Sequence, residues 1–299
     1  YSNVFTDGDN DDGDITKTIL SNNNTDLVSA SVSGNTVTLD YVANQYGTAT
    51  ITVRGTSNSS TVDDAFVVTV TGVNDEPSFT KGSNVTVNED VGAQTVSGWA
   101  SSLSKGPNDP SSQALTFTVT NDNNSLFSTQ PAISSSGVLT FTPTANASGS
   151  ATVSVVLADD GGTANSGDDT YATQTFTITV NTVDDAPTVG NALADITVDE
   201  DASNTGVDLS NVFTDVDNDD SAITKAVLTN SNTSLVSATI SGNTLTLDYQ
   251  ENQCGTATIT VRATSNGKTV DEELTVTVNC IDDAPTVANA VADFTVLED

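Results

Sequence analysis

Apolar and polar residues alternate one by one along much of the chain. Val, Ile, Leu or Phe occupy every second position, usually with Thr between them, in the segments 35–41, 48–54, 115–120, 175–180 and 273–278. This alternation of β-branched residues is typical of strands with one buried and one exposed face. No stretch has a convincing helical period, and Gly, Asn, Asp and Ser occupy the gaps. The pattern predicts an all-β protein built from short strands.

The strand pattern belongs to an internal repeat. Residues 1–77 align with 209–285 without a gap, and most positions are identical. A shorter period appears as well. The phrase VNDEP at 73–77 returns as VDDAP at 183–187 and IDDAP at 281–285, and each copy precedes a strand pattern that ends in an acid pair, at 85–90, 196–201 and 294–299.

The repeat predicts four parts. We expect complete modules at 77–186 and 187–284, an incomplete module without its first strand at 1–76, and the first strand of a following module at 285–299. About seven short strands in roughly one hundred residues is the size of an immunoglobulin-like β-sandwich. Because the chain begins in the middle of the pattern, we expect it to be part of something longer.

The charge of the chain narrows the partners it can have. The sequence carries 40 acidic and 7 basic residues, no His, and a formal net charge of −33. Such a surface repels nucleic acid and anionic membranes, and it opposes compaction unless cations neutralise it. No segment has the length of a membrane span, and no signal peptide is recognisable.

The order of motifs within a module resembles a known family. An acid pair follows the first strand, an Asp-x-Asp loop comes later, and Asn-Asp-x-Pro or Asp-Asp-Ala-Pro ends the module. Over the whole chain, this order resembles the cadherin-like repeats of large bacterial surface adhesins. The Asp-Arg-Glu motif of cadherins is missing. The resemblance implies tandem immunoglobulin/cadherin-like β-sandwich modules in an elongated rod, an extracellular or cell-surface location, and calcium ions that stiffen the junctions between modules.

In this topology, the junction between the second and third modules gathers acids from three places. The first-strand pair of one module, the linker and the Asp-x-Asp loop of the next module contribute Glu89, Asp90, Asp184, Asp185, Asp215 and Asp217. Six carboxylates suit calcium, which takes about six to eight oxygen ligands. The same logic assigns further calcium ligands to other junctions, namely Asp7, Asp9, Glu200, Asp201, Asp282, Asp283, Glu298 and Asp299.

The junction between the first and second modules has a different ligand set. Its linker is Asn74–Asp75, and the loop of the second module offers Asp109 alone. Asp159 and Asp160, in the last hairpin turn of that module, are candidates to replace the missing ligands. We therefore expect a site of different geometry and weaker affinity at this junction.

Two other interpretations of the acids can be compared with the junction hypothesis. Asp7, Asp9 and Asp11 have the spacing of an EF-hand, but Thr18 stands where the loop needs a bidentate Glu, and no helices are predicted. An EF-hand is therefore excluded. The second alternative is a solvated, salt-tolerant surface with no bound ion.

The two cysteines predict a disulfide. A hairpin that turns at Asn266–Gly267 would place Cys254 directly opposite Cys280, and the first module lacks both cysteines together. A disulfide fits an oxidising, extracellular setting, and closing this loop would contribute roughly 3–4 kcal/mol in the chain-entropy model. The alternative is a pair of buried free thiols. Zinc is improbable because the chain has no His.

Three further side chains leave alternatives open. Lys17 and Lys225 fall on inward strand positions, which suggests either an isopeptide bond to an Asn or lysines that extend outward to nearby acids. Trp99 is expected to anchor the core rather than to provide a stacking platform for a sugar.

These features favour a structural role over catalysis. We expect a calcium-stiffened extender segment of an extracellular adhesin or surface fibre. The alternative is a calcium-dependent binding module for carbohydrate or for identical modules, including a filament in which the 285–299 segment complements the open edge of the first module. We expect no enzyme, because no His base is present and thin sandwiches offer no deep cleft.

Overall fold

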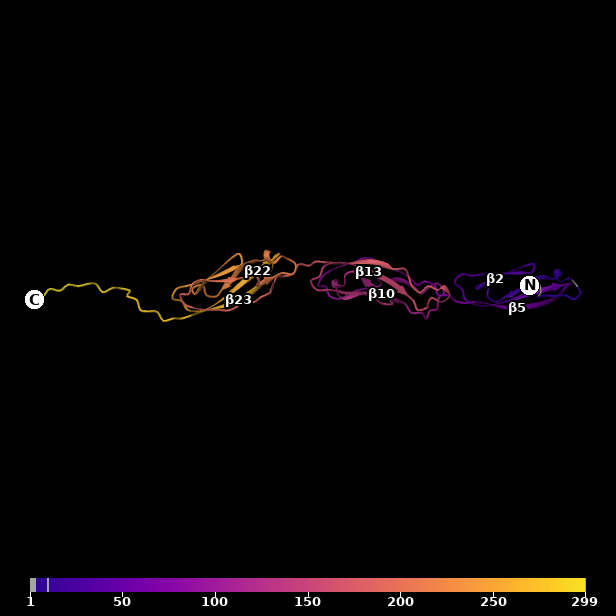
Figure 1. The fold of residues 1–299 in the computed structure, drawn as a ribbon, viewed down its shortest axis with the longest axis horizontal. Coiled ribbons are helices and arrows are strands. Elements are labelled where there is room, and N and C mark those ends of the chain that lie inside the picture. The colour runs from indigo at the N-terminus through magenta and orange to yellow at the C-terminus, as the bar shows by residue number, and fades with distance from the viewer. Residues whose placement is uncertain (1–3, 10, 299) are drawn as a thin grey trace. The chain divides into compact units, whose positions relative to one another are not determined.

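The computed structural model describes residues 4–9 and 11–298, and strands dominate them (Figure 1). The helical elements among these residues are short 3-10 turns: η1 (Asp12–Asp14), η2 (Asn124–Leu126), η3 (Ala164–Ser166) and η4 (Asp220–Ala222). The all-β prediction is confirmed, and the strands follow the alternating segments because each buries its apolar side chains on one face. No helix in the described part of the chain is long and apolar enough to cross a membrane.

The chain divides into two compact units, residues 1–181 and 182–299. Within the first unit, the strands form two groups that share no sheet, and we call these groups modules 1 and 2. The strands of the second unit form module 3. The finer boundaries expected from the repeat, and the rod-like arrangement, remain predictions.

Module 1 contains a three-stranded sheet of order β1-β4-β5 and the hairpin β2-β3. Its core includes Leu27, Val28 and Ile51, each almost completely buried. The strands are β1 (Thr16–Asn22), β2 (Val28–Ser33), β3 (Thr36–Tyr41), β4 (Gly47–Ser57) and β5 (Ser60–Val70).

Module 2 contains a four-stranded sheet β10-β13-β14-β7, a three-stranded sheet β11-β12-β8 and the pair β6-β9. The first strand of the large sheet, β7, runs parallel to the last one, β14. The strands are β6 (Ser78–Thr80), β7 (Val85–Asn88), β8 (Gln94–Val96), β9 (Ser101–Ser104), β10 (Thr116–Asn121), β11 (Phe127–Ile133), β12 (Leu139–Pro143), β13 (Gly149–Ala158) and β14 (Gln174–Asn181).

Module 3 repeats this plan as a β-sandwich. The sheet β16-β23-β22-β19 packs against β17-β21-β20, while β15 pairs with β18. β16 runs parallel to β23, as β7 does to β14. The strands are β15 (Thr188–Val189), β16 (Ile196–Asp199), β17 (Thr205–Asp208), β18 (Phe213–Thr214), β19 (Thr224–Asn230), β20 (Val236–Ser241), β21 (Thr244–Tyr249), β22 (Gly255–Ser265) and β23 (Lys268–Asn279).

Modules 1 and 3 differ in how well one face of the sandwich is covered. Among the described residues, no strand pairs with the outer edge of β5, whereas β16 covers the equivalent edge of β23. Likewise, no described strand lies beside β3 as β17 lies beside β21, so Tyr41 on β3 is 58 % exposed, while Tyr249 at the equivalent position on β21 is 7 % exposed. The Tyr249 hydroxyl lies 2.9 Å from Oγ1 of Thr205 on β17. The near-identical sequences thus bury different amounts of apolar surface.

The predicted disulfide joins Cys254 to Cys280, but the predicted register is wrong. The hairpin turns at Asn266–Gly267 as expected, and this two-residue turn pairs Ser265 with Lys268 and Gly255 with Val278. The cysteines are therefore not directly opposite each other, because Cys254 is level with the residue before Cys280. Both lie beyond the paired strands, and the adjacent Gly255 has a φ of +140°, a backbone conformation that favours glycine.

The structure gives the surroundings of Trp99, Lys17 and Lys225, for which the sequence left alternatives open. Trp99 is 4 % exposed, its Nε1 donates to the Ser83 carbonyl at 3.0 Å, and its ring lies 4.2 Å from that of Phe176. It is a core anchor, as expected. Lys17 and Lys225 are half-buried, and each donates to the carbonyl two residues earlier. Lys225 Nζ also donates to Asn243 Oδ1 at 2.9 Å.

We predict that replacing both cysteines by serine (Cys254→Ser with Cys280→Ser) lowers the unfolding free energy of the second unit by roughly 2–4 kcal/mol, because the unfolded chain regains loop entropy. Scanning calorimetry should show a lower melting temperature for that unit. The transition of the first unit, which has no cysteine, serves as the internal control and should not move. A double variant whose second unit melts at the wild-type temperature would contradict the prediction.

Candidate functional site

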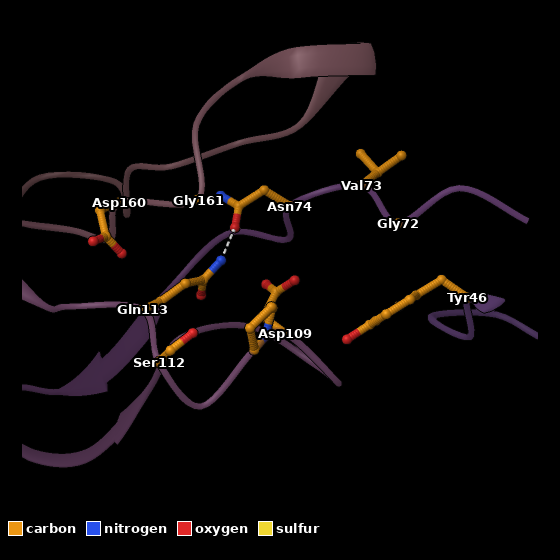
Figure 2. Close-up of a pocket in the computed structure, with 10 residues that line it drawn as sticks. Tyr46, Gly72, Val73, Asn74, Asp109, Ser112, Gln113, Asp160 and Gly161 are labelled. Carbon is orange, nitrogen blue, oxygen red and sulfur yellow. Dashed lines mark hydrogen bonds between the residues drawn. The ribbon is translucent and has the colours of Figure 1, made fainter.

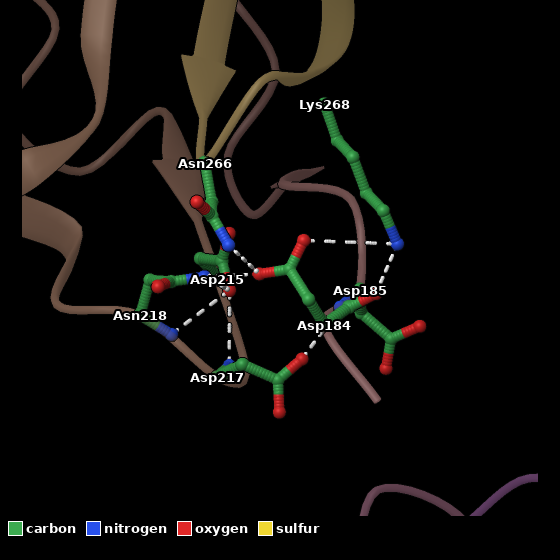
Figure 3. A network of polar contacts seen from close by, with 7 residues as sticks. All are labelled: Asp184, Asp185, Asp215, Asp217, Asn218, Asn266 and Lys268. Atoms are coloured by element: carbon green, nitrogen blue, oxygen red, sulfur yellow. Dashed lines mark hydrogen bonds and ion pairs between the residues drawn. The ribbon is translucent and has the colours of Figure 1, made fainter. Parts of the chain in front are cut away.

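The linker that enters module 3 is bound by acid and amide side chains of that module. The Asp185 amide donates to Asp217 Oδ2 at 2.6 Å. Asp184 Oδ1 accepts from Asn218 Nδ2 and from Asn266 Nδ2, both at 2.9 Å (Figure 3). Pro187 just beyond is buried. The linker acids therefore lie against the Asp-x-Asp loop and the turn between β22 and β23.

The Asp-x-Asp loop is held in shape by its own side chains. Asp215 Oδ1 accepts from the amides of Asp217 at 2.9 Å and Asn218 at 3.0 Å, and the Asp215 amide donates to Asp220 Oδ1 at 2.7 Å. Asp219 caps η4 through the Ser221 amide. Such side-chain-to-backbone bonds are the reason that Asp is favoured in turns. The loop thus presents its carboxylates from a preformed backbone.

Hydrogen bonds keep two of these carboxylates ionised. The pKa of Asp184 is lowered mainly by the Asn266 and Asn218 amides, with a smaller contribution from Lys268. The pKa of Asp215 is lowered chiefly by the polar side chain of Ser265, against the opposing effect of burial. Both groups carry full negative charge at neutral pH, so the site offers anionic oxygen.

Some oxygens of this cluster have no partner. Asp185 Oδ2 and Asp215 Oδ2 are buried and accept no hydrogen bond in the described part of the protein. A buried, unpaired carboxylate oxygen is costly, and a cation would remove that cost. Hard oxygen donors of this kind are the ligands that calcium takes. The residues present therefore fit such an ion.

The linker between modules 1 and 2 repeats one contact of this cluster. The Asp75 amide donates to Asp109 Oδ2 at 3.0 Å, as Asp185 does to Asp217. Asn74 replaces Asp184, and its Nδ2 donates to Asp159 Oδ1 at 2.9 Å and to the Asp168 carbonyl at 2.7 Å. The divergent sequence of module 2 thus preserves the way the linker is bound.

Gln113 completes this second cluster. Its Nε2 donates to Asn74 Oδ1 at 2.6 Å (Figure 2). Within the described residues, its own Oε1 is buried without a hydrogen-bond partner, as is Oδ2 of Asp159, a residue that is only 9 % exposed. Asp160 instead accepts from the Ala114 amide at 2.7 Å. The structure therefore brings Asp159 to the linker residue Asn74, while Asp160 holds the neighbouring segment.

The first-strand acid pairs of modules 2 and 3 lie at the opposite end of their module, where the last strand leaves. The Glu89 amide donates to the Asn181 carbonyl, and the Glu200 amide to that of Asn279, both at 2.9 Å. Asp90 and Asp201 accept from backbone amides of the adjacent turns, Asn146 and Asn252, at 3.1 and 3.0 Å. Glu200 also accepts from the Ile281 amide at 2.6 Å. The expected position of the pairs beside the outgoing linker is thus observed within each module.

Among the described residues, the remaining predicted ligands do not form a cluster with one another. In module 1, the Asp7 amide donates to Asp12 and the Asp9 amide to Asp7, which reproduces the loop of module 3. Asp282, Asp283 and Glu298 are exposed, and Asp299 lies outside the described residues. Across residues 4–9 and 11–298, no three Asp, Glu, Cys or His side chains are grouped as a formed metal site.

Four amide or ammonium side chains that contact the linkers were not predicted from the sequence. Gln113, Asn218, Asn266 and Lys268 all bind linker residues. Asn218 could have been noticed, since it interrupts an acid cluster. The other three give no local signal, because their role depends on where the tip of a hairpin meets the linker.

We predict that the second unit loses stability in acid through these carboxylates. Their folded pKa values lie below the ordinary value, so their contribution is complete above the unfolded pKa of about 3.9 and is lost as the pH falls through the folded pKa. Melting temperatures measured in chelator from pH 6 to 3 should fall less steeply for Asp215→Asn than for the wild type. Asp293→Asn, at an exposed acid, is the control. Identical profiles for all three proteins would contradict the prediction.

Comparisons with known proteins give a structural likeness only. No protein-family model matches the sequence, and no curated protein matches it significantly. Mouse protocadherin-24 EC1-3 superposes with a TM-score of 0.46 at 17 % identity, covering 89 % of this chain and 90 % of that one. Drosophila N-cadherin EC1-4 gives 0.37 at 15 % identity, with 89 % and 68 % covered. An endo-fucoidan hydrolase of glycoside hydrolase family 107 gives 0.29 at 11 % identity, with 89 % and 39 % covered. Values this low assign neither a site nor a function to the chain.

Proposed function

We propose that this chain is an extender segment of an extracellular adhesin or surface fibre, and that calcium stiffens the junctions between its modules. The observation that carries the proposal is the repeated binding of the linker. At both linkers, a backbone amide donates to a loop carboxylate, Asp185 to Asp217 and Asp75 to Asp109. Beside both contacts lie buried oxygens that accept no hydrogen bond from any residue the structure describes.

Each junction would hold the ion through residues of the linker and of the modules beside it. At the second junction, Asp184, Asp185, Asp215 and Asp217 would supply carboxylate oxygens, and Glu89 and Asp90 would complete the set from the preceding module. At the first junction, Asn74, Asp75, Asp109 and Asp159 would act with Gln113, whose Oε1 is unpartnered. The bound ion would supply positive charge that ties the linker to its neighbours and restricts bending.

Three further observations support a non-catalytic, extracellular spacer. The net charge of −33 makes neutralisation by cations favourable. The disulfide suits an oxidising compartment. The divergent segment of module 2 is bound at the linker rather than free, since Asp109 contacts Asp75 and Asn108 Nδ2 donates to the Asn44 carbonyl at 2.8 Å.

We predict that calcium at about millimolar concentration, the range of extracellular calcium modules, raises the melting temperature and lengthens the particle in small-angle scattering. A variant with Asp185→Asn and Asp217→Asn should keep its fold in chelator but lose the response of the second junction. Magnesium at equal ionic strength controls for screening. An unchanged melting temperature and an unchanged radius of gyration in calcium would overturn the proposal.

A second candidate role is assembly with identical copies by strand complementation. In module 1, the outer edge of β5 carries no strand among the described residues, whereas β16 pairs with the equivalent edge of β23 in module 3. The 285–298 segment repeats the sequence pattern of the covering strand β16, and its Val291, Phe294 and Val296 are between 79 % and 89 % exposed. In the register of β16 on β23, where Ile196 is level with Val276, Phe294 would lie beside Val68 of β5 in a second copy.

The carbohydrate alternative has less support. Trp99, the single tryptophan, is buried in the core of module 2 and offers no stacking platform.

We predict that strand complementation makes the chain associate reversibly with concentration, and that Phe294→Asp abolishes association. The matched control is Leu297→Asp, because Leu297 is equally exposed but aligns with the outward-facing Asp199 of β16. Sedimentation velocity over a hundred-fold range of concentration measures the effect. A monomer at every concentration, or equal loss in both variants, would rule out this role.

A further inference from the structure

The turn between β22 and β23 places a lysine on the linker of module 3. Lys268 follows the turn residue Gly267, and its ammonium donates to the main-chain oxygen of Asp184. The same nitrogen lies 3.7 Å from Asp184 Oδ2 (Figure 3). The side chains of Lys268 and Asp184 are 46 % and 28 % exposed. One cation thus contacts both kinds of oxygen that the linker residue offers.

Module 2 contacts its linker through a carboxylate where module 3 uses an ammonium group. There, Asn74 stands in the place of Asp184, and the hairpin supplies the carboxylate of Asp159, 2.9 Å from Asn74 Nδ2. The Asp168 amide also donates to the Asn74 carbonyl at 3.0 Å. The hairpin thus contacts Asn74 through an acid in module 2 and Asp184 through a cation in module 3. In module 1, the repeat aligns Ser60 with Lys268, so the lysine is particular to module 3.

The ammonium occupies oxygens that a divalent ion would need. A calcium ion takes carboxylate and main-chain carbonyl oxygens at close range. Lys268 holds one of each on Asp184, while Asn266 and Asn218 donate to the other carboxylate oxygen. Two cations cannot share these oxygens without strong repulsion. The lysine must withdraw before a metal ion can bind Asp184.

We propose that Lys268 is a built-in competitor of calcium at this linker. It holds the linker on module 3 when no metal is bound, and it weakens calcium binding at the cluster that has the most carboxylates. The inference rests on the proposed calcium function. It also reverses the expectation that the first junction binds calcium more weakly. Asp159 of module 2 raises the calcium affinity of the first junction, whereas Lys268 of module 3 lowers that of the second.

The test is calcium binding to the full chain by isothermal titration calorimetry, with the wild type compared with Lys268→Ser, which installs the residue of module 1. We expect Lys268→Ser to bind calcium about tenfold more tightly at one class of site, as removal of one partly screened charge would give. Asp159→Asn identifies the other class by weakening it. In chelator, the melting temperature of the second unit should be lower for Lys268→Ser than for the wild type, because the linker loses its contact with the Lys268 ammonium.

Lys268→Arg, which keeps the charge, is the matched control and should bind calcium as the wild type does. If Lys268→Ser binds calcium with wild-type affinity, the competitor role is overturned while the spacer function stands. If only Lys268→Ser binds calcium, the competitor role stands and the spacer function fails for the natural sequence. If neither protein binds calcium at millimolar concentration, both proposals are overturned.

Discussion

Pairing between the last two strands of each module is the interaction on which the rest of the structure depends. In module 3, β22 and β23 form a continuous ladder from Gly255–Val278 to Ser265–Lys268. One face of this hairpin contributes Ile259, Val261 and Val276 to the core, all fully buried. The tip holds the incoming linker through Asn266 and Lys268, and the open end leads into the disulfide. Core, linker and cross-link are therefore positioned by one register.

The large negative charge is arranged around this framework. In module 3, the Asp215 carboxylate accepts hydrogen bonds from the backbone amides of Asp217 and Asn218, which contributes to its lowered pKa and fixes its position. Surface ion pairs are local, as between Arg54 and Asp63 and between Arg262 and Asp271, at equivalent places in modules 1 and 3. Exposed pairs of this kind contribute little to stability. The charge that matters for the proposed function is the charge gathered at the linkers.

Modules 1 and 3 show how strongly burial depends on a neighbouring strand. Leu39 and Leu247 occupy equivalent positions, yet Leu39 is half-buried and Leu247 is fully buried. The difference arises because β17 pairs with β21 in module 3, whereas β3 pairs with β2 alone among the described strands. The alternating pattern states which face is apolar, but the presence of a covering element decides whether that face leaves water.

The amino-acid sequence by itself determined the strand-rich fold, the repeat, the core position of Trp99 and the pairing of Cys254 with Cys280. These follow from short-range periodicity and from the copy of one module in another, which need no knowledge of how segments meet. The hairpin register follows from the two-residue turn at Asn266–Gly267, which places Ser265 opposite Lys268 and Gly255 opposite Val278. Only the tertiary structure decided that Asp159 rather than Asp160 reaches Asn74, and that Lys268 contacts Asp184. Contacts between a hairpin tip and a distant linker depend on backbone geometry to within an ångström, which periodicity and composition do not encode.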